Sequence, residues 1–130
     1  MPFAYTIDVD RDVVFVLAEG TITDEELLAV VRAYTSDPRY HPAIRVFSDY
    51  SAVTHNGLTA LSVRGLAKMV KPAPDSRRAV FVNELVAFGM VRMYQAYCQA
   101  HEMSYPVPFY SRAEALEYLN AGVPSERVIR

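Results

Sequence analysis

The residues of this chain whose types and spacing could do chemistry lie between positions 44 and 61, in the stretch IRVFSDYSAVTHNGLTAL. Asp49 and Ser51 are two residues apart, so both side chains would point to one face of an extended segment, and His55 could curl back toward them. Such a trio could form a hydrolase triad. Nucleophilic catalysis also needs preorganised oxyanion donors, and the sequence has no G-x-S-x-G nucleophile elbow. A Ser51 hydrolase is therefore the third of three hypotheses.

The same residues also suit a structured turn that binds without catalysing. Asp and Ser at a strand exit commonly bond nearby backbone N–H groups, and Asn56 would be a good N-cap for a helix that begins near Leu58. The N-terminus of that helix could bind a small anion, because its N–H groups are free and its dipole end is positive. The predicted binding residues of this turn are Asp49, Ser51, His55, Asn56 and Gly57.

Basic residues follow this turn in the sequence. They are Arg64, Lys68 and Lys71 at helical spacing, then Arg77 and Arg78, whereas the first fifth of the chain is mostly acidic. A solvated helix face is the ordinary explanation for such a run. The alternative is a docking stripe for a partner, which could be an acidic surface of another copy, and on this hypothesis Arg64 and Lys68 join the predicted binding surface.

These residues need a scaffold, and the periodicity predicts one. Alternating apolar residues at 3–9 and the β-branched run at 13–20 predict a hairpin, and Thr23 with Glu26 predicts a capped helix. Strands are expected at 44–49 and in RRAVFVN, and helices from Leu58 to KPAP and from Leu85 to about Ala100.

The last predicted elements are a short strand and a helix. PVPFY is a short strand whose prolines favour a sheet edge, and Ser111 with Glu114 begins a final helix that Gly122 should end. The order is β-β-α-β-α-β-α-β-α, which predicts an α/β domain with a mixed, mainly parallel five-stranded sheet and four helices.

Composition narrows the function classes. The chain has 130 residues and a formal net charge of -2, which fits one domain and disfavours nucleic-acid binding. No stretch approaches the length of a membrane span, and the single Cys98 is best explained as a packed thiol in a reducing cytoplasm. His41 and His101 are isolated, and no His, Cys, Asp or Glu cluster has metal-ligand spacing, so we expect neither a metal nor another cofactor.

The predicted helix at 85–100 is apolar almost all round and must cover something beyond its own sheet. Self-association is one explanation, and an internal apolar pocket between this helix and the one before it is another. Gly89 suggests close approach of a backbone or ligand, although a simple packing glycine is the more ordinary explanation. The residues predicted for the dimer contact or the pocket are Phe88, Met90, Val91, Tyr94 and Tyr97.

Three segments, LAEGTIT, VFSDYSAVT and VPFYSRAEALEYL, together with the element order, resemble the STAS-like fold and its SpoIIAA-like group over nearly the whole chain, 1–130. The resemblance implies a single domain. In the anti-sigma-factor antagonists of this family, a kinase phosphorylates a Ser at the start of the second helix. The alignment that places residues 49–54 on the family's DLSGVT leaves that Ser without a counterpart, so Ser51 and Thr54 are the remaining acceptor candidates.

The sequence and the resemblance together lead to a first hypothesis and one alternative. The first is a non-enzymatic cytoplasmic binding or regulatory module that lacks the phosphoacceptor Ser, recognises a protein partner and forms a homodimer through the helix at 85–100. The alternative is a carrier of a small lipophilic or anionic ligand, as in the Sec14-like domains with which this fold is grouped.

Overall fold

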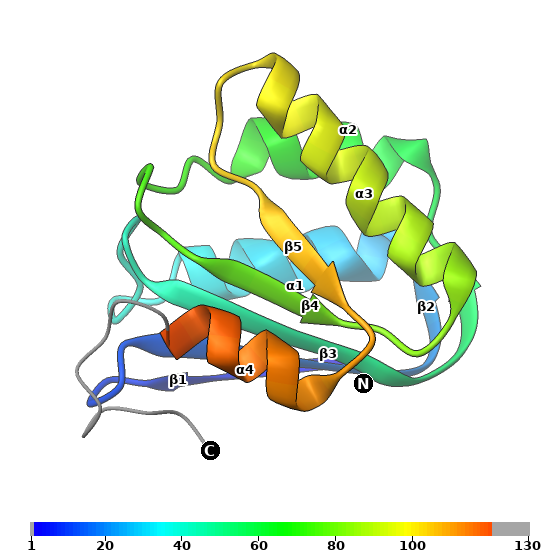
Figure 1. Cartoon of the computed structure of the whole chain (residues 1–130), viewed down its shortest axis with the longest axis horizontal. Helices are drawn as coiled ribbons and strands as arrows, with labels where there is room; N and C mark the ends of the chain where they lie inside the picture. The colour runs from blue at the N-terminus through cyan, green and yellow to red at the C-terminus, as the bar shows by residue number, and fades with distance from the viewer. Residues whose placement is uncertain (1, 121–130) are drawn as a thin grey trace.

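One five-stranded sheet organises residues 2–120, which are the residues that this computed structural model describes (Figure 1). The strands lie in the order β1-β2-β3-β4-β5; β1 and β2 are antiparallel, and the other neighbours are parallel. The elements are β1 (Phe3–Asp8), β2 (Val13–Thr23), α1 (Asp24–Thr35), β3 (Arg45–Gly57), α2 (Ala60–Met69), β4 (Arg78–Phe81), α3 (Leu85–Ala100), β5 (Pro106–Phe109) and α4 (Arg112–Asn120). The predicted fold class and element order are confirmed. Gly122, the expected end of the last helix, lies outside the described residues.

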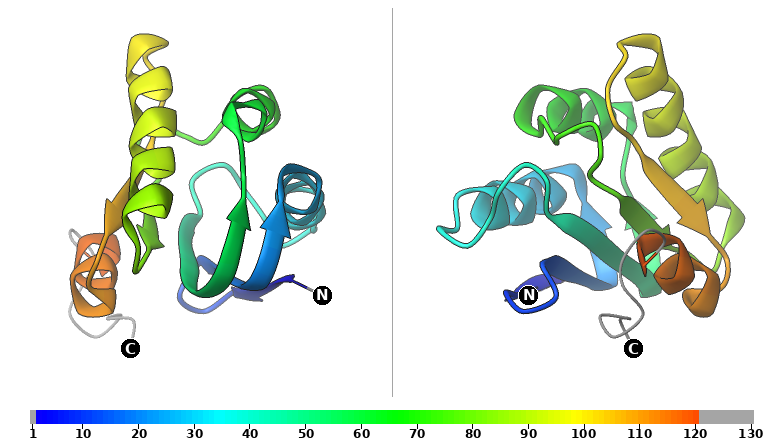
Figure 2. Two further views of the ribbon diagram at one scale, coloured as in Figure 1. Left: turned by 90° about the vertical axis from the view of Figure 1, so that its right-hand side faces the viewer. Right: turned by 60° about the vertical axis from the view of Figure 1, so that its left-hand side comes forward.

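The helices cover the two faces of the sheet unequally. Helices α1, α2 and α3 lie on one face and α4 lies on the other (Figure 2). Side-chain alternation along the strands decides which residue meets which layer. Val14 and Val46 pack toward α1, whereas their neighbours Val13 and Phe47 pack under α4.

The residues predicted to cap the first turns of α1 and α4 do so in the structure. The Thr23 hydroxyl accepts a hydrogen bond from the Glu26 N–H (3.3 Å) and donates one to the Glu26 carboxylate (3.0 Å) at the start of α1. Ser111 Oγ accepts from the Glu114 N–H (3.2 Å) at the start of α4. The proline-bearing strand β5 is an edge strand, as expected, because proline cannot donate to a further neighbour.

Strand β3 is much longer than expected. The predicted strand ended near Asp49 and was followed by a turn, but β3 continues to Gly57 and pairs with β2 as far as Thr23. The reason is non-local: β2 is 11 residues long and supplies backbone partners for the whole polar segment. Two register shifts between these strands place extra residues in β3. The prediction of a turn at 49–57 is therefore wrong.

The start of α2 is also displaced from the prediction. Thr59, not Asn56, is the N-cap, and its hydroxyl accepts from the Leu61 N–H (3.2 Å). Asn56 still lies in β3, and its side-chain oxygen accepts from the Leu58 N–H (3.0 Å). Helix α2 consequently begins at Ala60, two residues after the predicted start.

Two glycines differ in what surrounds them. A Cβ at Gly57 would lie 2.7 Å from the Ile22 carbonyl oxygen of β2, so the close approach of β2 and β3 requires glycine there. A Cβ at Gly89, on the exposed side of α3, would meet nothing within 4 Å. The expectation that Gly89 marks a close approach is therefore wrong.

The same substitution at these two glycines should have opposite effects on stability. We expect Gly57→Ala to lower the free energy of unfolding by about 1–3 kcal/mol, because the new methyl group overlaps backbone. Gly89→Ala should raise it by about 1 kcal/mol, because alanine is the better helix former. Urea unfolding of both variants beside the parent measures these differences, and a loss of stability at Gly89 equal to that at Gly57 would contradict the assignment.

Candidate functional site

Asp49 is occupied by contacts within the fold. Its Oδ1 accepts hydrogen bonds from the Ser51 N–H (2.9 Å) and hydroxyl (2.6 Å), and its Oδ2 pairs with Arg112 (3.0 Å). The Arg112 guanidinium also lies over the Phe47 ring, 5.0 Å from its centroid. Asp49 thus stabilises the irregular part of β3 and attaches the first residue of α4 to the sheet.

The candidate triad is not assembled. His55 is exposed and pairs by register with Thr21, four residues beyond Ser51, which is roughly 13 Å along an extended strand. The Ser51 hydroxyl donates to Asp49, so no imidazole is placed to accept its proton. Thr54 is exposed on β3. The geometry therefore lacks the base that activates a nucleophile.

The remaining members of the predicted surface patch lie apart. Asp49 contacts α4, whereas Arg64 and Lys68 are exposed on α2, which covers the opposite face of the sheet. The N-terminus of α2 already holds a carboxylate: Asp24 accepts from the Thr59 N–H (2.8 Å) and from its hydroxyl. The anion site expected at this helix end stays a prediction, and an added anion would have to compete there with the Asp24 carboxylate.

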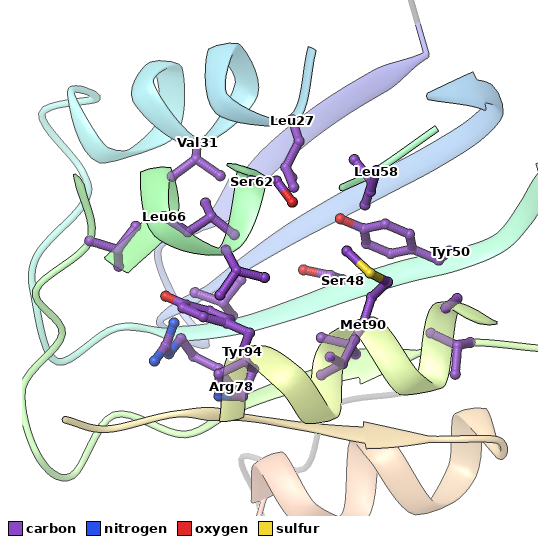
Figure 3. Close-up of a pocket in the computed structure, with 18 of the residues that line it drawn as sticks. Leu27, Val31, Ser48, Tyr50, Leu58, Ser62, Leu66, Arg78, Met90 and Tyr94 are labelled. Atoms are coloured by element: carbon purple, nitrogen blue, oxygen red, sulfur yellow. The ribbon is translucent and has the colours of Figure 1, made fainter. Parts of the chain in front are cut away.

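A different site lies between the sheet and helices α1, α2 and α3, where there is a cavity of about 100 Å³ (Figure 3). Small side chains from three elements, Ser48, Ser62 and Ala87, face it and leave the space unfilled. Most of the remaining wall is apolar. Leu27, Leu58, Leu66, Val80 and Met90 contribute to it.

The residues predicted for a pocket or dimer contact divide into two groups. Met90, Val91 and Tyr94 line this cavity. Phe88 instead stacks on Tyr110 with 4.5 Å between ring centroids, and Tyr97 stacks on His101 at 4.3 Å. Helix α3 is also less covered than predicted, since Leu85 and Val86 in its first turn are 78% and 64% exposed.

Three buried polar atoms at the cavity have no hydrogen-bond partner within the described chain. They are Asn56 Nδ2, Arg78 Nε and the Tyr94 hydroxyl, and all three residues line the cavity. Arg78 is only 7% exposed and Tyr94 only 6%. Leaving a buried donor unpaired costs about 1–3 kcal/mol. Unpaired buried polar atoms are rare in native cores, and three of them lie at this one cavity. The cavity is therefore the best candidate for a binding site.

Arg78 brings an uncompensated positive charge to the cavity. Among residues 2–120 it forms no ion pair, and the cavity wall contains no Asp or Glu. Burial raises the pKa of Tyr34, Tyr50 and Tyr94, although the charge of Arg78 opposes this effect at Tyr34 and Tyr94. The phenols are therefore neutral at physiological pH and supply no negative charge to offset the guanidinium.

The sequence contains a signal for Arg78 that was not used. In RRAVFVN, Arg78 alternates with Val80 and Val82, and period-2 alternation places all three on one face of the extended segment that contains β4. Both valines are buried, so an arginine on their face must enter the core. Arg77, its neighbour, lies on the other face, over the Tyr118 ring of α4 (4.9 Å). The basic residues predicted as one run therefore form no single surface. Arg77 and Arg78 lie on opposite faces of the sheet, and Arg64 and Lys68 are exposed on α2.

Cys98 is packed where α2 and α3 meet. Its side chain is fully buried in a cluster with Val63, Ala67 and Tyr94. Burial raises the pKa of the thiol, so it is protonated at physiological pH. Over residues 2–120, no group of three His, Cys, Asp or Glu side chains is placed to hold a metal ion. In the same range, no helix has both the length and the apolar character needed to cross a membrane.

Comparison with known proteins gives information on the fold alone. Neither a scan of protein-family models nor a search of curated proteins finds a match. Among solved structures, the chain is similar to an uncharacterized protein of the DUF3478 family from Shewanella loihica PV-4, described as having a SpoIIAA-like fold. The sequence identity is 16% and the TM-score 0.56, over 90% of this chain and 93% of that one. The chain therefore has the SpoIIAA-like fold that its sequence pattern predicts.

Proposed function

We propose that this protein is a non-enzymatic binding module whose ligand is a small lipophilic molecule held in the cavity between the sheet and helices α1–α3. One observation supports this function over the others: three polar side chains, Asn56, Arg78 and Tyr94, each place a buried atom without a hydrogen-bond partner in the described chain at one apolar cavity. Ligand sites combine an apolar wall with a few placed polar groups in this way. This geometry favours the carrier hypothesis over recognition of a partner at the exposed end of β3.

The size of the cavity limits the ligand. An engineered apolar cavity of about 150 Å³ in another protein binds benzene. At about 100 Å³ this cavity is smaller, so a single ring or a short branched chain is the upper limit for its ligand. A long acyl chain would require the helices to move apart.

The contacts of Ser51 support the non-enzymatic part of the proposal. Its hydroxyl donates to Asp49, and His55 lies elsewhere on the strand. A hydrolase would need these three groups in one chain of hydrogen bonds. Binding without bond cleavage requires none of this.

Filling the cavity should abolish binding. Ala87 faces the cavity and Ala96 is exposed on the same helix, so Ala87→Leu and Ala96→Leu form a matched pair. We expect Ala87→Leu to weaken the affinity for toluene by about tenfold or more, because the added carbons occupy the site, and Ala96→Leu to leave it unchanged. NMR titration of the methyl groups measures both affinities. If the parent binds neither toluene nor any other single-ring compound, or if Ala87→Leu binds as the parent does, the proposed site is wrong.

A second function, self-association, is supported by a separate observation. Leu61 in the first turn of α2 and Leu85 and Val86 in that of α3 are 64–78% exposed. Both helices follow parallel strands, so both first turns lie toward the carboxyl ends of those strands. We propose that a second copy of the chain covers these residues.

A carboxylate in place of the exposed Val86 side chain should prevent two copies of the chain from associating. We expect the parent to have the mass of a dimer at high micromolar concentration and Val86→Asp to have the mass of a monomer, because a buried carboxylate without a partner is strongly unfavourable. Size-exclusion chromatography with light scattering gives both masses. Arg92→Asp, on an exposed position of the same helix, is the control and should leave the mass unchanged. A monomeric parent would eliminate this second function.

A further inference from the structure

We infer that the ligand of the cavity is a small monocarboxylate, and that Arg78 and Tyr94 bind its carboxylate group. This inference rests on the proposed function and specifies the chemical class of the ligand. It is argued from the position, hydrogen bonding and charge of the buried guanidinium. A site for a purely apolar ligand would need no such group.

The guanidinium of Arg78 is held in place with part of its donor set unused. Arg78 is the first residue of β4, and its Nη2 donates to the Ser104 carbonyl (2.6 Å) in the segment before β5. Its Nε, buried at the cavity, has no partner in the described chain. One contact therefore fixes the planar group while a donor remains for a ligand.

Tyr94 supplies a second donor beside the first. The central carbon of the Arg78 guanidinium lies 5.9 Å from the centroid of the Tyr94 ring. The buried hydroxyl interacts with this guanidinium and with the Cys98 thiol, but it makes no well-formed hydrogen bond within the described chain. The phenol remains protonated because burial raises its pKa. In Figure 3 both residues lie at the end of the cavity away from Tyr50 and Leu58. One N–H and one O–H at the same end can bind the two oxygens of a carboxylate.

The charge balance favours a monoanion. Among residues 2–120, Arg78 is the only charged residue in the cavity wall, and the buried tyrosines are neutral. A carboxylate would neutralise the site, whereas a phosphate dianion would leave an uncompensated negative charge among apolar side chains. A neutral ligand would leave the guanidinium without a counter-charge. An ammonium compound would be repelled.

The rest of the ligand should be apolar, with room for one hydrogen-bond acceptor far from the carboxylate. Val80, Met90 and Leu66 belong to the apolar wall of the cavity. Asn56 belongs to the distal end of β3, and its unpaired Nδ2 is a donor. An aromatic or branched aliphatic acid of about one ring in size fits this arrangement.

Compounds with one ring and different head groups test the inference. We would titrate the full-length protein with benzoate, benzamide and benzylammonium at neutral pH by NMR or calorimetry. We expect benzoate to bind at least about tenfold more tightly than benzamide, and benzylammonium to bind most weakly. A benzamide affinity equal to or above that of benzoate would overturn the inference.

Three variants assign the preference to residues. Arg78→Met keeps the length of the side chain and should remove the preference for benzoate over benzamide, while Tyr94→Phe should weaken benzoate severalfold. Arg64→Met, an exposed position on α2, is the control and should match the parent. Persistence of the benzoate preference in folded Arg78→Met would overturn the inference. If that variant does not fold, the head-group series on the parent together with Tyr94→Phe still decides it.

The outcomes separate this inference from the proposed function. If toluene and benzamide bind but benzoate binds no better, the cavity is a ligand site and only the carboxylate assignment is wrong. If no ring compound binds to the parent, and Ala87→Leu behaves as the parent does, both the function and the inference are wrong.

Discussion

The parallel pairing of β2 with β3 is the constraint on which the rest of the structure depends. It extends from Val13 opposite Arg45 to Thr23 opposite Gly57, and its two register shifts decide where the side chains of β3 point. Val46 and Val53 pack in the same core cluster although they are an odd number of residues apart, which a regular strand would not allow. The second shift directs Asn56 to the cavity. The position of Asn56 at the cavity therefore follows from this pairing.

The cavity combines features that act against stability. A guanidinium with no counter-ion in the described chain lies among valine, leucine and methionine side chains, and three small residues leave space where larger ones would pack. Burying an unpaired charge costs several kcal/mol in real proteins. The extensive apolar clusters on both sides of the sheet supply the stability that offsets this cost. Unfavourable groups gathered in one place are a common mark of a functional site.

The fold could be predicted from the sequence to a greater extent than the site. Alternation at 3–9, the Thr23 cap and the prolines of β5 are local signals, and local sterics and hydrogen bonds determine their structure. The length of β3 could not be predicted, because its polar second half is held by residues some thirty positions earlier. The same error displaced the helix cap from Thr59 to Asn56. Arg78 was recognisable from its alternation with Val80 and Val82, but its proximity to Tyr94 depends on how α3 packs.

The burial of Cys98 has a practical consequence for observing motion in this protein. It is the only cysteine of the chain, it is inaccessible to solvent, and it lies where α2 meets α3 beside the cavity. Alkylation requires the thiolate and a path for the reagent, so its rate measures how often this helix contact opens. The native chain thus carries its own kinetic reporter of helix separation, and no label has to be engineered into it.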